Sequence, residues 1–184
     1  LVAAQRDDGS IGHTHFWGAK FGGLRHVVGL GQSHPGEFLK GTALMQPPVI
    51  AQAVECVSRI TKDPLLAPRF MARLDRYHEW LVLNRVPDDD GLLVIVSPDD
   101  AGATRSPALD AALGFKTRPS RWRMGLKDTW IDARNWLAAY DSKVMMQKGQ
   151  FLVKDALVNG VYADSLATMA RMHRAQGNFR TAEA

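Results

Sequence analysis

Residues 87–110 carry the side chains best suited to chemistry, because acidic segments stand on both sides of a short apolar run. Residues 88–90 are three aspartates, the apolar run covers 92–96, and Asp99 and Asp100 follow it. Carboxylates grouped in loops can transfer protons as general acids and bases, or bind hard cations such as Ca²⁺. The stretch therefore predicts loops that display carboxylates.

A metal site is the first alternative to weigh for these acidic residues. The turn at 88–90 lacks the twelve-residue loop and terminal glutamate of an EF-hand, which favours a turn that ends a helix. His13 and His15 would share one face of an extended segment, as half of a zinc site does, but no third ligand has a diagnostic spacing, and Asp7 and Asp8 are unconvincing helpers. We therefore expect no metal ion and no other cofactor.

Three segments occur in an order typical of one enzyme family. Residues 87–110 contain P-D-D-D-G-L-L and then P-D-D-A-G-A-T-R-S-P-A-L-D, residues 41–54 read G-T-A-L-M-Q-P-P-V-I-A-Q-A-V, and residues 151–177 begin F-L-V-K-D-A-L-V-N-G-V-Y. Together they resemble the α-glycosidases with an (α/α)6 barrel, the group of mannosylglycerate hydrolase and the processing α-glucosidases. The resemblance implies an all-α fold built from helical hairpins, and hydrolysis of small α-glucosides or α-mannosides such as glycosylglycerates.

The resemblance also implies an inverting mechanism, which needs two carboxyl groups. One protonated acid gives a proton to the departing oxygen, and one carboxylate activates water on the opposite face of the sugar. In the family the acid is the aspartate of D-N-S-P, but Thr104 stands at that position here, and the base is a glutamate much nearer the C-terminus. A threonine hydroxyl does not lose a proton at accessible pH. The sequence therefore predicts a fragment or a degenerate copy of such a hydrolase.

Asp100 is the carboxyl group that we consider as a substitute for the missing acid. It matches the glutamate of the family's E-S-G and lies four residues before Thr104, a displacement of many ångströms in an extended loop. The alternative is that Asp99 and Asp100 only cap and solvate the loop.

The residues predicted to bind substrate are side chains able to hydrogen-bond or stack on a sugar ring: Trp17, Gln46, Trp80, Arg105, Asp155 and Asn159. Gln46 precedes two prolines at an expected helix N-terminus, and the tryptophans offer flat apolar faces to a pyranose. Asp155 and Asn159 are four residues apart and so share one face of a helix. Core packing is the alternative for the tryptophans, and a favourable charge at a helix N-terminus is the alternative for Asp155.

Two functions without catalysis also fit the sequence. The first is a non-catalytic carbohydrate-binding or scaffold remnant of the same fold. The second is an anion or nucleic-acid binder, because residues 116–127 hold five basic side chains around Trp122, within a C-terminal part that carries the excess of the net charge of +4. No nucleic-acid motif accompanies this cluster, which favours a solvated loop and makes nucleic acid an unlikely partner.

The elements that must position these residues are mainly helices. Apolar periodicity and capping residues predict helices at about 47–60, 64–85, 107–113, 129–146 and 154–176, with Asp63 as the N-cap of the second. Residues 1–45 and 114–127 are expected to be loops, and 92–96 a short strand or buried extended segment. Gly177 is expected to end the last long helix.

The chain of 184 residues is expected to form one incomplete barrel domain over its full length, because six helical hairpins require a much longer sequence. Roughly half a barrel would leave apolar helix faces uncovered, so we expect self-association as well as a small carbohydrate ligand. The sequence shows neither a long apolar run nor a secretory leader, which predicts no membrane partner and favours a cytoplasmic location.

Overall fold

The computed structural model describes residues 4–13, 41–103, 106–149 and 151–178. The predictions for His15, Trp17, Thr104 and Arg105 fall outside these residues. The fold is helical, as predicted, and the described residues contain an isolated β-bridge between Ile95 and Val153 but no extended strand. The helices are α2 (Ile50–Thr61), α3 (Leu66–Arg85), α4 (Arg121–Leu137), α5 (Ser142–Lys148) and α6 (Ala156–Ala175), with short 3-10 helices η2 (Pro98–Ala101) and η3 (Pro107–Leu109).

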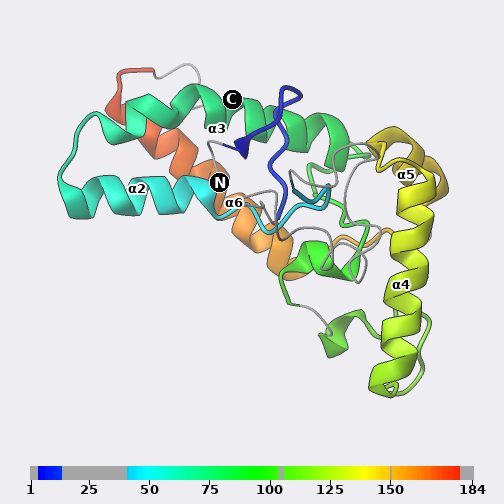
Figure 1. The fold of residues 1–184 in the computed structure, drawn as a ribbon. Coiled ribbons are helices and arrows are strands. Elements are labelled where there is room, and N and C mark those ends of the chain that lie inside the picture. The colour runs from blue at the N-terminus through cyan, green and yellow to red at the C-terminus, as the bar shows by residue number, and fades with distance from the viewer. Residues whose placement is uncertain (1–3, 14–40, 104–105, 150, 179–184) are drawn as a thin grey trace, which may run out of the picture.

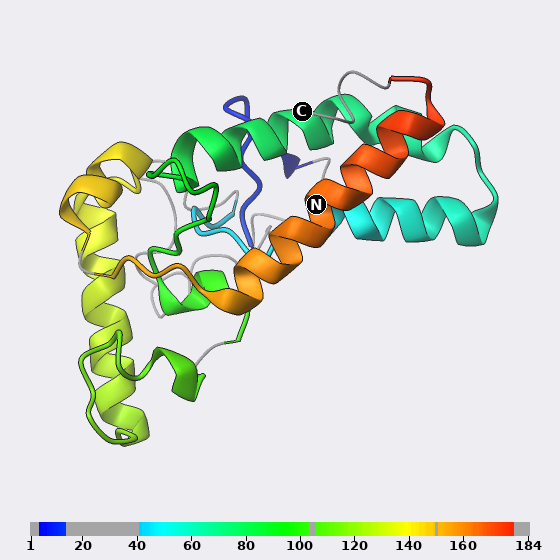
Figure 2. The ribbon, with the colours of Figure 1, turned by 180° about the vertical axis from the view of Figure 1, so that it is seen from behind.

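Helices α2 and α3 form a hairpin, and α6 lies across it (Figures 1 and 2). Their contact is one apolar cluster made of Ala51, Val54, Met71, Leu74, Met169 and Met172. The connection bends at Lys62, whose φ is 55°, and the Asp63 carboxylate then accepts a hydrogen bond from the Leu65 N–H at 2.9 Å. Asp63 thus forms a turn before the helix rather than the predicted N-cap, and α3 begins at Leu66.

A second core lies under the C-terminal half of α3, around the apolar run that follows the acidic turn. Residues 93–96 are buried there, and Ile95 exchanges two backbone hydrogen bonds with Val153 at 2.9 and 3.2 Å. Asn159 of α6 holds the same run from the side: its amide accepts from the Leu93 N–H at 2.8 Å and donates to the Leu93 carbonyl at 3.0 Å. The prediction of a buried extended segment is confirmed.

The prediction of a single helix at 129–146 is wrong in two respects. The helix begins earlier than predicted, and the segment forms two helices. α4 begins at Arg121, so Arg121, Arg123 and Lys127 of the basic cluster lie in its first turns, whereas Lys116 and Arg118 lie in the loop before it. The break falls at Ala139 and Tyr140, whose φ values are 54° and 53°, and Asp141 then caps α5 by accepting from the Val144 N–H at 3.0 Å. α4 stands at the far end of the molecule from α2 (Figure 1).

The last long helix follows the prediction closely. α6 begins after Asp155, which caps it by accepting a hydrogen bond from the Val158 N–H at 2.9 Å. It ends at Ala175, and Gly177 follows with a φ of 77°, a conformation that glycine adopts at little cost.

No helix among the described residues is both long and apolar enough to cross a membrane.

Candidate functional site

Asp100 organises the loop that leads toward position 104. Its carboxylate is fully buried in η2 and accepts hydrogen bonds from the Met45 N–H at 2.9 Å and the Val96 N–H at 2.8 Å. These two donors come from segments that are far apart in the sequence. Asp100 therefore ties the segment before the two prolines to the buried run and to the start of the acidic loop.

Arg85, the last residue of α3, is the charge partner of this buried carboxylate. Its Nη1 atom lies 3.6 Å from Asp100 Oδ2, and both side chains are at most 1% exposed. Burial raises the pKa of the Asp100 carboxyl, while the Arg85 guanidinium and the N–H groups of Val96 and Met45 oppose that rise. Because arginine keeps its charge, the ionised carboxylate is the form that leaves neither charge unpaired. The pair places a buried ionic contact directly behind the loop.

The loop also approaches the segment with the two prolines closely. Gly102 ends η2 with a φ of 65°, and a Cβ atom at this position would lie 3.1 Å from the Pro47 Cδ atom. Both the conformation and the space favour glycine. The next described residues, Ala103 and Ser106, are joined by a backbone hydrogen bond of 3.0 Å, from the Ser106 N–H to the Ala103 carbonyl.

Gln46 lies on the exposed side of this contact, at a small cavity of about 40 Å³ that His13 and Tyr77 also line. His13 Nδ1 is 2.8 Å from Thr42 Oγ1, and the backbone N–H of His13 donates to the Leu44 carbonyl at 2.8 Å. Burial lowers the pKa of the His13 imidazole, against the opposing effect of the Asp99 and Asp100 carboxylates. The cavity has room for one or two water molecules or hydroxyl groups, and its lining is mostly apolar.

The other described candidates for substrate binding lie in the interior or at a helix end. Trp80 is 8% exposed and packs in the second core, with the Arg85 guanidinium carbon 5.6 Å from its ring centroid. Asp155 caps α6, and the Asn159 amide bonds the backbone of Leu93. Trp80 matches the alternative of core packing, and Asp155 lies at a helix N-terminus, where its alternative placed a favourable charge. A contact of these residues with a sugar stays a prediction.

The carboxylates of the acidic turn at 88–90 form ion pairs with a lysine of the same chain. Lys154 Nζ lies 2.5 Å from Asp88 Oδ2 and 2.6 Å from Asp90 Oδ2, and these bonds raise the pKa of the Lys154 ammonium. The described residues contain no group of three or more potential metal ligands. The turn therefore joins the end of α3 to the segment before α6.

The basic cluster on α4 and the loop before it has partners of its own. Arg118 bonds both carboxylate oxygens of Asp110 at 3.0 and 3.1 Å, and the Arg123 guanidinium lies 5.7 Å from the centroid of Phe115. Lys127 lies over Trp130 at 5.0 Å. Such contacts are expected on a folded surface and point to no particular ligand.

Sequence reasoning missed Arg85 and undervalued His13. A signal for Arg85 was present, because it continues the buried stripe of α3 four residues after Leu81, where a charge needs a buried counterion. His13 was considered only as a metal ligand. Its position beside Gln46 depends on contacts with Thr42 and Leu44, which no local pattern reveals.

Comparison with known proteins supports the resemblance. The sequence model of the mannosylglycerate hydrolase MGH1-like glycoside hydrolase domain matches residues 1–184. Mannosylglycerate hydrolase MGH2 of Selaginella moellendorffii is 28% identical over 163 residues, which are 82% of this chain and 30% of that protein. The mannosylglycerate hydrolase of Thermus thermophilus is 37% identical over 82 residues, 39% of this chain and 18% of that protein.

Solved structures show the same fold over half of a longer chain. The GH63 mannosylglycerate hydrolase from Thermus thermophilus, in complex with Tris and D-glycerate, matches with a TM-score of 0.76 and 20% identity, covering 98% of this chain and 49% of that one. Its complex with glucose matches with a TM-score of 0.70 and 19% identity, covering 97% and 47%. The chain therefore spans about half the length of these solved relatives and less of the curated ones.

Proposed function

The chain belongs to the mannosylglycerate hydrolase MGH1-like glycoside hydrolase family, and from that premise we propose that it carries one half of a binding site for a small α-linked glycoside. The centre of this half-site is Gln46 together with the loop around Asp100 and Gly102. The ligand class is an α-mannoside or α-glucoside of a small polyol acid, because a related structure holds D-glycerate and another holds glucose.

The observation that carries this proposal is the fixed contact between two segments that both match family motifs. Asp100 bonds the backbone of Met45, the residue before Gln46, and Gly102 packs against Pro47. Two loops that are tied together in this way hold their exposed side chains in a constant relative position, which lowers the entropy cost of binding a rigid ligand. The exposed amide of Gln46 can then donate to and accept from sugar hydroxyls.

We propose further that this chain binds the glycoside without hydrolysing it efficiently. Inverting hydrolysis needs a carboxylic acid at the departing oxygen, and the matching position holds Thr104. Asp100 is a poor replacement, because its carboxylate is fully buried, faces Arg85 and accepts two backbone hydrogen bonds. Its proposed role is to position the loop. The chain thus represents a fragment or degenerate copy of an α-glycoside hydrolase.

The test is a calorimetric titration with α-mannosylglycerate, accompanied by an assay for released mannose. We expect saturable binding, no release of mannose above the uncatalysed rate, and a roughly fivefold weaker affinity for Gln46→Ala, since one lost hydrogen bond to a ligand contributes about 1 kcal/mol. Gln147→Ala, an exposed glutamine on α5, is the matched control and should bind like the wild type. Absence of binding, or equal loss in both variants, would refute the proposed site.

A scaffold remnant of the same fold is the second candidate, and the contacts of Trp80, Asp155 and Asn159 favour it. All three side chains are engaged inside the protein, which leaves fewer groups free for a sugar. Under this alternative the calorimetric titration shows no heat of binding, while the fold and its stability are unchanged. Self-association and a cytoplasmic location remain proposals beside it.

A further inference from the structure

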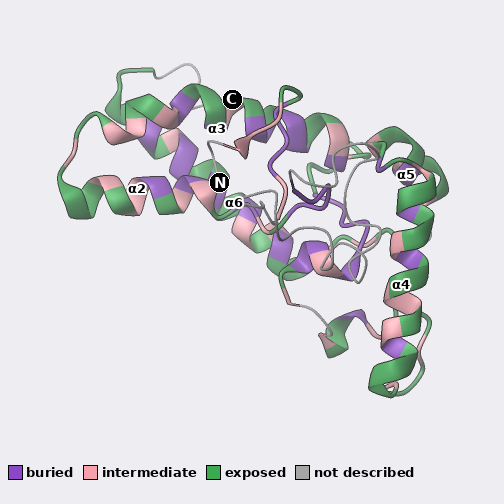
Figure 3. Ribbon diagram, in the orientation of Figure 1, coloured by how far each residue is buried: buried purple, intermediate pink, exposed green. Residues whose placement is uncertain are grey.

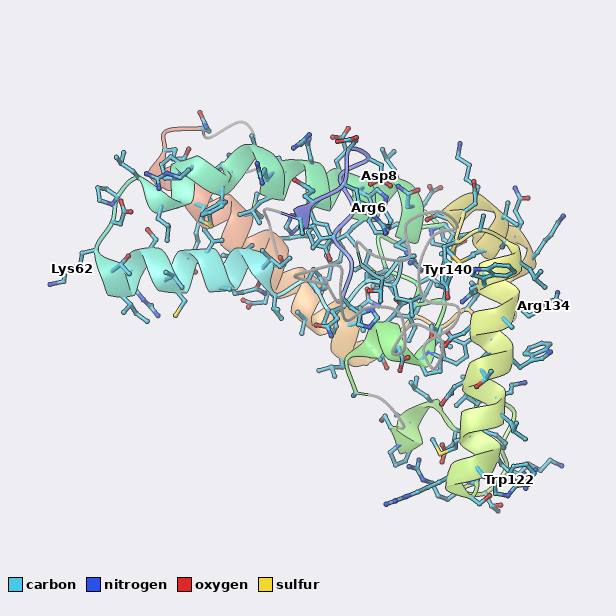
Figure 4. All side chains as sticks on the ribbon, in the orientation of Figure 1. Arg6, Asp8, Lys62, Trp122, Arg134 and Tyr140 are labelled. Atoms are coloured by element: carbon cyan, nitrogen blue, oxygen red, sulfur yellow. The ribbon has the colours of Figure 1, made fainter. Side chains whose placement is uncertain are left out.

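The half-site contains a small cavity of about 40 Å³, whose walls come from three separate segments. It is lined by residues 11–13 of the N-terminal segment, by residues around the two prolines and by Tyr77 of α3. Figure 4 shows Arg6 and Asp8 of the N-terminal segment beside α3, and Figure 3 shows buried residues where the segments meet. A backbone hydrogen bond of 2.8 Å, from the His13 N–H to the Leu44 carbonyl, joins the first two segments. The cavity therefore depends on contacts within the described chain and not on an uncovered helix face.

Three polar side chains line this cavity, and each keeps a hydrogen-bonding group that no described residue uses. Tyr77 is only 2% exposed, yet its hydroxyl has no hydrogen-bond partner among the described residues. The Gln46 amide has no such partner either, and the His13 ring engages only Nδ1, which lies 2.8 Å from Thr42 Oγ1. Burial raises the pKa of the Tyr77 hydroxyl and lowers the pKa of the His13 imidazole. The phenol therefore keeps its proton as a donor, and the neutral imidazole offers its second nitrogen.

The remaining side chains of the lining are apolar and belong to Ile11, Pro47, Val49 and Ile50. The volume admits a group of about two non-hydrogen atoms, so a sugar ring cannot enter. A carboxylate is unsuited, because apolar walls do not solvate a charge and the Asp99 and Asp100 carboxylates already act electrostatically on His13. A hydroxymethyl group matches both properties of the cavity. Its methylene can contact the apolar walls, while its hydroxyl exchanges hydrogen bonds with the three polar side chains.

We propose that this cavity binds a hydroxymethyl group of the ligand, with the Tyr77 hydroxyl as hydrogen-bond donor and His13 as a second partner. The inference rests on the proposed function, because it names the part of the small α-linked glycoside that the half-site selects. Two hydroxymethyl groups of an α-mannosylglycerate have this chemistry, one on the hexose and one on the glycerate. Tyr77 and His13 are thus specificity-determining residues, which discriminate against ligands that carry a methyl group at this place.

The test is a calorimetric comparison of α-mannosylglycerate with two analogues that each lack one hydroxyl group. One analogue is 6-deoxy-α-mannosylglycerate, and the other is α-mannosyl lactate, in which a methyl group replaces the glycerate hydroxymethyl. We expect one analogue to bind the wild type about fivefold more weakly than the parent, which identifies the group in the cavity, and the other to bind like the parent. In Tyr77→Phe that difference should shrink to less than about twofold. The matched control is Tyr162→Phe, a buried tyrosine of the same core that does not line the cavity and should keep the wild-type difference.

Equal affinity of the wild type for all three ligands would overturn the assignment of the cavity and leave the half-site at Gln46 intact, with water in the cavity. A difference that persists undiminished in Tyr77→Phe would also overturn it, because another group would then bind the hydroxyl. Absence of binding of every ligand would refute the half-site itself and this assignment with it. The comparison of ligands on the wild type needs no variant, and circular dichroism confirms that Tyr77→Phe and Tyr162→Phe keep the fold.

Discussion

The hairpin of α2 and α3 with α6, and the separate helix α4, use apolar side chains in different ways. In the first region the apolar stripes of three helices meet in one closed cluster, and polar contacts such as the 2.9 Å bond between His78 Nε2 and Ser165 Oγ cross the interface. α4 has one apolar side on the protein and another exposed. The difference teaches that α2, α3 and α6 bury one apolar stripe against one another, whereas the second apolar side of α4 is exposed among the described residues.

The site lies between these two regions and depends on a buried ionic contact rather than on apolar packing. The largest expected loss of unfolding free energy therefore comes from Asp100→Ala. It leaves the Arg85 guanidinium without its counterion and two backbone N–H groups without an acceptor, which costs about 3–5 kcal/mol of unfolding free energy. Urea unfolding followed by circular dichroism measures this loss. Asp99→Ala, in the same loop but partly exposed, is the control and should change stability far less.

A pair of leucine substitutions sharpens the contrast between the two helical regions. Leu74→Ala removes a fully buried side chain from the α2, α3 and α6 cluster and should cost about 2–5 kcal/mol. Leu126→Ala, on the exposed side of α4, should change the stability of the monomer by no more than about 0.5 kcal/mol. Chemical unfolding followed by circular dichroism compares them. Equal losses would contradict the view that this side of α4 is uncovered.

The smallest expected effect is a pH dependence of the α3 and α6 contact. Burial lowers the pKa of His78, whose ring nitrogens bond the Leu74 carbonyl and Ser165, against the opposing effects of that carbonyl and Asp75. A histidine with a lowered folded pKa is neutral in the native state, so the unfolded chain binds the proton more readily. Its stability contribution is intact above pH 6.5, the ordinary value, and is lost as the pH falls through the folded pKa.

Unfolding midpoints at about pH 7.5 and about pH 5.0, on either side of the ordinary histidine pKa, measure this effect for the wild type and for His78→Gln. The glutamine variant can keep a hydrogen bond to Ser165 but has no proton to gain. Its stability should therefore fall less on acidification than that of the wild type. Parallel decreases in the two proteins would assign the acid sensitivity to other groups.

The parts of the fold that the sequence predicts are those with one buried side per helix. The stripes of α2, α3 and α6 and the stop at Gly177 were visible, because each follows from local spacing or from a glycine at a helix end. Asp155 was expected as a charge near the start of α6, but its capping hydrogen bond was not predicted. The prediction for the first turns of α4 was wrong. Its two apolar sides blur the helical period, and the basic residues between Arg121 and Lys127 look like a solvated loop.

The site was predictable only as far as its motifs extend. The motif around Asp100 and the glutamine before the two prolines were recognised, but their contact through the Met45 N–H was not, because it joins residues 55 positions apart. The burial of Asp100 and its pairing with Arg85 depend on the same tertiary contact. Spacing in a sequence cannot show which carboxylate faces a cavity and which faces a guanidinium.

The most direct test of the account is a ¹⁵N-edited NMR titration of the chain with α-mannosylglycerate, at a protein concentration where it is monomeric. We predict saturable shifts at the amides of Met45, Gln46, Ala101 and Gly102, with the amides of α4 unchanged. Shifts concentrated on Trp122 to Leu137, or no saturable shifts anywhere, would contradict a ligand half-site formed by the two joined loops.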